Sequence, residues 1–233
     1  MDQPYKNIFA GIITGITNTI IFNPYDKALY LQVKNNTKFF DKKNWINPYS
    51  GISQSLIHRT ISYGLYFPIY DFYKKNTTFT NYKIISDSIL TGCTTSILIN
   101  PINVIKYNKW NNIEIKYNLI YLTKGIKYTI LRDVIFTLNY NCLNQKYNKN
   151  KNIIVDIILG CISTLCVSPI NYCRNIVFSS PQKVYFKNII NNIRYDNLTN
   201  IILNKFNIGY GTIRVGLGMS ISKLLYENLI DII

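Results

Sequence analysis

Acidic residues are scarce in this sequence. Only 11 aspartates and glutamates stand against 26 lysines and arginines, which gives a formal net charge of +15. Such an excess of positive charge favours anionic partners: nucleic acid, anionic lipid or an anionic solute. The basic residues are dispersed among long apolar runs rather than gathered on one helix, so we expect no nucleic-acid partner. Charged residues make up only 16% of the chain, against roughly 25% in soluble domains, which favours a membrane protein.

The chain also has little of what metal sites and enzymes need. It contains one histidine, and its five cysteines form no CxxC pair. Neither a zinc site nor a disulfide framework is therefore expected. The sequence has no glycine-rich phosphate loop, and no nucleophile, base and orienting acid stand in a plausible register. We expect no cofactor and no enzymatic activity.

Six apolar stretches, each long enough to cross a bilayer, divide the sequence. The connections after the second and fourth stretches are short, whereas the other three are longer, so the stretches pair into three hairpins. The mean hydropathy of only +0.03 indicates helices with a polar face that lines water. The predicted fold is an all-α membrane protein with six transmembrane helices. The stretches lie at roughly 7–33, 52–73, 84–107, 122–145, 153–177 and 208–232.

The odd-numbered stretches each contain a proline preceded by a small polar residue, at Asn23-Pro24, Asn100-Pro101 and Ser168-Pro169. A proline inside a helix removes a backbone hydrogen bond and kinks the helix. Three matching kinks predict three repeats related by pseudo-threefold symmetry within one integral domain. The repeats cover residues 1–80, 81–150 and 151–233.

The even-numbered stretches each carry an arginine about three turns before their polar end. These residues are Arg59, Arg132 and Arg214, and His58 and Asp133 lie next to two of them. Arginine inside a membrane segment is costly and is a functional candidate by default. Its planar guanidinium suits bidentate recognition of phosphate or carboxylate.

These patterns resemble the mitochondrial carrier family, whose repeat has Pro-x-acid-x-x-base at the end of each odd helix and aromatic-acid-x-x-base at the end of each even helix. The likeness covers nearly the whole chain, although the charges are incomplete. The odd motifs contain Pro24 and Asp26 with Leu29 as the would-be base, then Pro101, Asn103 and Lys106, then Pro169, Asn171 and Arg174. The even motifs contain Tyr70, Asp71 and Lys74, then the degenerate Asn144 and Gln145, then Tyr226 and Glu227.

The resemblance implies short matrix-side helices and transport by alternating access, in which charged residues close each end of a cavity in turn. At the matrix gate it pairs Asp26 with Lys106 by an ion pair and Asn103 with Arg174 by a hydrogen bond. Gln32 is a candidate brace beneath the first of these pairs. The cytoplasmic gate retains only Asp71, Lys74 and Glu227 as charged members, with Tyr70 and Tyr226 as its aromatic residues.

For the substrate, the resemblance implies anionic metabolites bound by Arg59, Arg132, Arg214, His58 and Asp133. The positive balance favours nucleotides. Asn, Ile, Lys and Tyr are abundant and Ala is scarce, which indicates an AT-rich coding sequence and points to deoxynucleotides such as dATP and dTTP. An amino acid or carboxylate remains open, because an Arg-Asp pair like Arg132-Asp133 accompanies amino-acid substrates in the family. A membrane scaffold that does not transport also remains open, because the gates are weakened. The family further implies a monomer in the mitochondrial inner membrane, with basic loops that suit cardiolipin.

Overall fold

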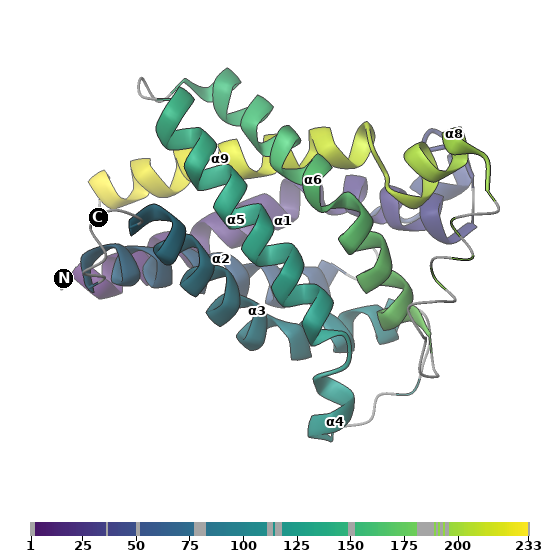
Figure 1. The fold of residues 1–233 in the computed structure, drawn as a ribbon, viewed down its shortest axis with the longest axis horizontal. Helices are drawn as coiled ribbons and strands as arrows, with labels where there is room; N and C mark the ends of the chain where they lie inside the picture. Colours follow the sequence, from purple (N-terminus) through teal and green to yellow (C-terminus); the bar gives the residue numbers. More distant parts are fainter. Residues whose placement is uncertain are drawn as a thin grey trace.

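The computed structural model describes residues 3–35, 37–49, 52–76, 83–110, 114, 118–148, 152–180, 189, 191, 193 and 196–232. Over these ranges the chain is helical and contains no strand (Figure 1), which confirms the predicted all-α class. The long helices are α1 (Gln3–Asn35), α2 (Ile52–Asn76), α3 (Lys83–Trp110), α5 (Ile126–Tyr147), α6 (Ile153–Ser179) and α9 (Tyr210–Ile232). The short ones are η1 (Lys42–Trp45), α4 (Leu119–Leu122), α8 (Leu198–Asn200) and the π-helical turn η2 (Ile201–Lys205).

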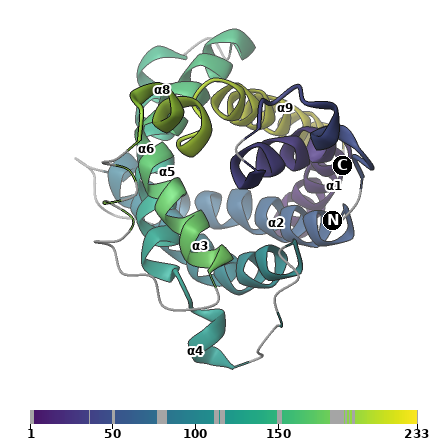
Figure 2. The same ribbon diagram turned by 90° about the vertical axis from the view of Figure 1, so that its right-hand side faces the viewer.

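The long helices pack side by side in chain order and close into a ring. Each helix contacts its two neighbours along the chain, and α9 returns to contact α1. Figure 2 shows the helices arranged around the ring. The two chain ends lie at one end of the bundle, whereas α8 lies at the opposite end (Figure 1). We call these the terminus end and the proline end, because α1, α3 and α6 run past their prolines toward the latter.

The prolines lie inside continuous helices, and the polar residue before each one has a defined contact. In α1 and α3 this residue is an asparagine that ties its helix to the chain segment leading into the next long helix. In α6 it is a serine that bonds within its own helix. The bonds run from Asn23 to the Pro48 carbonyl at 3.0 Å, from Asn100 to the Leu122 and Lys124 carbonyls at 2.9 and 3.2 Å, and from Ser168 to the Thr164 carbonyl at 2.8 Å.

One glycine in each odd helix lets an even helix approach closely. Gly15, Gly92 and Gly160 precede the proline of their helix by the same number of residues. A Cβ atom at any of them would collide with the backbone of the partner helix, so packing rather than chain flexibility requires glycine there. The same kind of close glycine contact therefore occurs in α1, α3 and α6. The Cβ would lie 2.8 Å from the Cα of Thr60, 2.8 Å from the Cα of Val134 and 2.9 Å from the Cα of Gly216, respectively.

Three helices are long and apolar enough to cross a membrane within the described part of the chain, over Tyr5–Gln32, Lys83–Asn108 and Ile153–Phe178. Their outward faces display large aliphatic side chains that soluble proteins rarely expose in such numbers. These include Ile20, Ile21, Ile97, Leu98, Ile158, Ile162 and Leu165. The helices have the length and surface expected of a membrane protein.

Candidate functional site

Asp26 ties three helices together at one carboxylate. It lies just beyond Pro24 in α1, and its Oδ2 atom forms an ion pair with Arg59 of α2. Arg214 of α9 approaches the same carboxylate with two nitrogen atoms, Nε at 2.5 Å from Oδ1 and Nη2 at 3.0 Å from Oδ2. The side chains of Asp26, Arg59 and Arg214 are 17%, 13% and 7% exposed, so the cluster is largely shielded from solvent. A buried carboxylate held by two guanidinium groups is a strong, geometrically defined contact.

Asn18 positions the two arginines by accepting hydrogen bonds from both. It lies about two turns before Asp26 in α1 and is fully buried. Its Oδ1 atom accepts hydrogen bonds from Arg59 at 2.6 Å and from Arg214 at 3.5 Å. Its Nδ2 atom donates to the Gly218 carbonyl at 3.0 Å and to the Ser222 hydroxyl at 2.6 Å. Both ends of the amide are used, so Asn18 fixes α9 and both guanidinium groups relative to α1.

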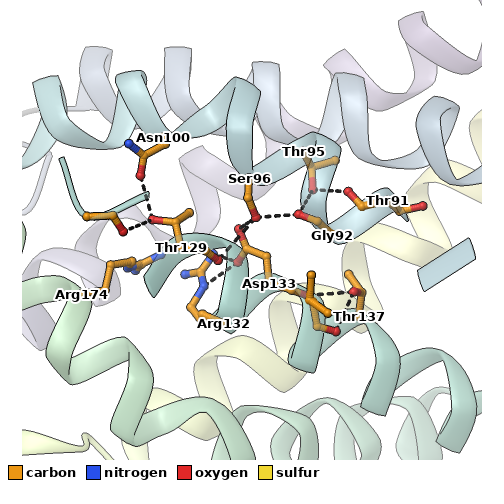
Figure 3. A network of polar contacts seen from close by, with 12 residues as sticks. Thr91, Gly92, Thr95, Ser96, Asn100, Thr129, Arg132, Asp133, Thr137 and Arg174 are labelled. Carbon is orange, nitrogen blue, oxygen red and sulfur yellow. Dashed lines mark hydrogen bonds and ion pairs between the residues drawn. The ribbon is translucent and has the colours of Figure 1, made fainter. Parts of the chain in front are cut away.

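A second arginine–carboxylate contact lies between α3 and α5 (Figure 3). Arg132 forms an ion pair with the adjacent Asp133, with 2.5 Å between Nε and Oδ1. The other carboxylate oxygen accepts a hydrogen bond from the Ser96 hydroxyl of α3 at 2.8 Å. Asp133 thereby orients Arg132 and attaches it to α3.

Arg174 and His58 have fewer partners than their burial demands. Arg174 of α6 is 5% exposed, and its Nε atom has no hydrogen-bond partner. Its Nη2 atom donates to the Asn175 side chain at 3.5 Å, and the guanidinium group also contacts the Tyr107 side chain and the ring of Phe178. Figure 3 shows it extending toward the network around Arg132 and Asp133. Both ring nitrogens of His58 are buried without a hydrogen-bond partner. Buried polar atoms are normally satisfied, so these atoms can accept a ligand's contacts.

These residues form one group, which we call the central cationic cluster. It contains Arg59, Lys106, Arg132, Arg174 and Arg214 as cations, Asp26 and Asp133 as carboxylates, and His58. Lys106 lies within electrostatic reach of Asp26 and Arg174, and His58 within reach of four of the cations. Five cations face two carboxylates, so the described cluster carries a formal excess of three positive charges. Buried charge of one sign is costly unless it is paired, so the cluster is suited to an anion.

The cluster combines residues that the sequence assigned to two separate sites. Asp26, expected at the matrix gate, makes its described ion pairs with Arg59 and Arg214, which were expected to bind substrate. The expected partner Lys106 lies nearby as a third positive charge. Within the described chain, Arg174 bonds to Asn175 and not to Asn103. Gln32 donates to the Leu203 carbonyl of η2 at 3.5 Å.

The glycine contacts also set the register of the even helices. Thr60, Val134 and Gly216 are equivalent by contact, and counting from them makes Asp71 equivalent to Glu227. In this register Arg132 and Arg214 are equivalent to His58, whereas Arg59 lies one residue further along. One residue turns a helix by about 100°. Arg59 therefore faces α1 and Asp26 rather than taking the place that Arg132 and Arg214 have in α5 and α9.

At the terminus end, the structure brings together some of the residues expected at the cytoplasmic gate. The Asp71 carboxylate accepts hydrogen bonds from the Tyr226 hydroxyl at 3.3 Å and from the Asn7 amide at 3.4 Å, which joins α2, α9 and α1. Tyr70 stacks on Tyr66 of its own helix, with 6.5 Å between ring centroids. Lys74 is exposed.

Sequence reasoning missed a buried ion pair between α6 and α9. Lys223 of α9 donates to both carboxylate oxygens of Asp156 in α6, at 2.9 and 3.1 Å. Asn144 and Tyr140 of α5 also donate to this carboxylate, the hydroxyl at 3.4 Å. The available signal was a single acid in the apolar stretch at 153–177 and a lysine in that at 208–232, because charges in apolar stretches require partners.

No protein-family model matches the sequence, and no curated protein matches it. A fold alone does not define a function. Function has to be inferred from the chemistry of the central cationic cluster.

Proposed function

We propose that the protein exchanges anionic metabolites across the mitochondrial inner membrane by alternating access, with nucleotides as its main substrates. The observation that carries this proposal is the central cationic cluster, to which every long helix of the ring contributes a charged side chain. These are Asp26 from α1, Arg59 from α2, Lys106 from α3, Arg132 and Asp133 from α5, Arg174 from α6 and Arg214 from α9.

The chemistry of the cluster favours phosphate groups. Guanidinium groups bind phosphate oxygens with two parallel hydrogen bonds. Several cations around one position suit a ligand that carries several negative charges close together, as a nucleoside triphosphate does. Arg174 brings a buried Nε atom without a partner, and His58 adds two ring nitrogens that can hydrogen-bond to such a ligand.

We further propose that all six long helices cross the membrane as three proline-kinked hairpins. Three of them have the required length and composition. The matched glycine contacts and the closure of α9 onto α1 support the same role for the other three. Helices α2, α5 and α9 carry Arg59, Arg132 and Arg214, whose side chains are largely shielded within the cluster instead of facing lipid.

Alternating access requires contacts that break at modest cost, and the terminus end offers such contacts. Asp71 is held there by two hydrogen bonds of 3.3 and 3.4 Å, which are long for bonds to a carboxylate. At the proline end, Asp26 has cations from three other helices within reach, Arg59, Arg214 and Lys106. Exchange of partners among them would accompany opening of that end.

One observation favours a second candidate, an amino-acid carrier. The adjacent Arg132 and Asp133 offer a cation and a carboxylate side by side, which suits the carboxylate and ammonium groups of an amino acid. Asp133 is bound to Arg132 and Ser96, so a zwitterion would have to displace these contacts.

Exchange measurements in liposomes test the proposal. Purified protein is reconstituted into vesicles loaded with ATP, dATP, dTTP, an amino acid or a dicarboxylate, and uptake of each labelled compound is measured. We expect saturable nucleotide uptake that depends on internal nucleotide. Arg174→Met should reduce it at least about tenfold, because a buried charge contact contributes more than about 1.4 kcal/mol. Lys127→Met, which removes an exposed charge from the first turn of α5, is the matched control. Uptake restricted to amino acids would favour the second candidate.

A further inference from the structure

We propose that Asp26 is an internal anion that occupies the ligand's place between Arg59 and Arg214, and that a bound anion displaces it. This inference deepens the proposed function and rests on it for one point, that the ligand is an anion. Its consequence is that Asp26 weakens ligand binding, although it lies in the binding site and stabilises the empty protein.

The geometry around Asp26 is that of an anion site with its anion bound. Arg214 contacts both carboxylate oxygens, and Arg59 adds a third contact to Oδ2. Carboxylate and phosphate present similar pairs of oxygens to a guanidinium group. The two arginines therefore provide for a ligand phosphate what they now provide for Asp26.

The arginine pair is held in place by residues other than Asp26. Asn18 accepts hydrogen bonds from both guanidinium groups and is itself anchored to α9 through Gly218 and Ser222. The ring of Phe22 lies 4.7 Å from the Arg214 guanidinium carbon, a favourable cation–π distance. The pair therefore keeps its arrangement when the carboxylate leaves, and an incoming anion finds it formed.

A displaced Asp26 has another cation to bind. Lys106 of α3 is already within electrostatic reach of the carboxylate. When a ligand neutralises the arginine pair, the attraction that holds Asp26 there weakens and pairing with Lys106 becomes favourable. Ligand binding would thus change which helix α1 is tied to at the proline end, from α2 and α9 to α3.

The internal anion is present in one repeat only. The positions equivalent to Asp26 in α3 and α6 hold Asn103 and Asn171, whose amides carry no charge. Because of this asymmetry, a carboxylate can be removed from one helix and added to another, with opposite expected effects on the affinity for anions. Asp26→Asn removes the internal anion, whereas Asn103→Asp adds one beside Lys106, three residues along the same helix and within reach of its charge.

The test measures binding of ATP and of inorganic pyrophosphate to purified protein in detergent, by isothermal calorimetry and by the ligand-induced rise in Tm, at fixed ionic strength. We expect Asp26→Asn to lower the Tm of the empty protein and to lower the Kd for both anions about tenfold, and Asn103→Asp to raise the Kd about tenfold. Asp156→Asn removes a buried carboxylate outside the cluster and is expected to leave the Kd unchanged.

A role for Asp26 in folding alone predicts something different. The inference is overturned if Asp26→Asn binds anions as wild type does or more weakly, or if Asn103→Asp does not weaken binding. Should Asp26→Asn give no cooperative unfolding transition, Asn103→Asp decides the matter by itself. Tighter binding by Asp26→Asn together with no exchange in vesicles would support the internal anion and contradict transport. Normal exchange with unchanged binding by both variants would contradict the internal anion and support transport.

Discussion

Replacing Gly160 by alanine tests whether close helix contact at the repeated glycines holds the ring together. A Cβ at Gly160 would lie 2.9 Å from the Cα of Gly216 on α9. Real Cβ atoms do not approach backbone this closely, so α6 and α9 must move apart. Alanine gains about 1 kcal/mol over glycine in helix propensity, whereas overpacking costs about 1–3 kcal/mol. Because the obstructing atom is backbone, we take the upper end of that range.

The net expectation for Gly160→Ala is a loss of about 2 kcal/mol, which lowers the Tm of a chain of this size by roughly 4–8 °C. Thermal unfolding in detergent, followed by circular dichroism, measures it. The matched control is Gly64→Ala, whose Cβ would lie 3.3 Å from a side-chain atom, Cγ1 of Ile12, and not against backbone. We expect the control to be as stable as wild type or slightly more so. Equal Tm values for the two variants would refute the close packing of α6 on α9.

Three further predictions concern single contacts. Asn18→Ala should lower stability by about 1–3 kcal/mol in thermal unfolding, because it leaves buried partners unsatisfied; an unchanged Tm would show that Asn18 does not brace the arginines. Lys223→Met should cost about 3–5 kcal/mol, because Asp156 remains buried without its cation, and Lys223→Met with Asp156→Leu should recover most of the loss; no recovery would contradict the pairing. Lys205 at the end of η2 bonds to Asp196 just before α8, and this hydrogen bond lowers the pKa of Asp196. The contact is therefore complete above the ordinary aspartate pKa and is lost as the pH falls through the lowered value. Lys205→Ala should return the pKa of Asp196 to its usual range in a carbon-13 NMR titration, and no change would contradict the assignment.

The helices could be predicted from the sequence because length, apolar content and kinking prolines are local properties. The start of α5 is a feature that these local properties did not predict. The apolar stretch was expected to begin near residue 122, whereas the helix starts at Ile126 because Gly125 adopts a left-handed conformation with φ of 71°. The residues before Ile126 form the short helix α4 and a turn. Apolar content alone does not distinguish these from the start of a long helix.

The site was harder to predict because it depends on helix register. Arg59, Arg132 and Arg214 look equivalent by their distance from the polar helix ends, and an error of one residue is small on that measure. On a helix, a shift of one residue changes the direction of the side chain by about 100°, so Arg59 contacts Asp26. The polar Asn18 could not be assigned from sequence, because its partners Arg59, Arg214, Gly218 and Ser222 lie far away along the chain.

The same limit explains why two predicted sites form one cluster. Family-like motifs suggested that Asp26 belongs to a gate and the arginines to a substrate site. The motifs carry no information on how far the gate and the substrate site lie from each other along the ring axis. The packing of α1 against α2 and α9 brings Asp26 and the arginines into contact.

Nucleotide exchange by the reconstituted protein tests the central claim most directly. Vesicles loaded with unlabelled ATP or dATP are mixed with the labelled compound, and uptake is compared with that of empty vesicles and of vesicles carrying Arg174→Met. The account predicts saturable uptake into loaded vesicles, little into empty ones and a strong reduction by the substitution. Correctly inserted wild-type protein that exchanges no labelled nucleotide would contradict it.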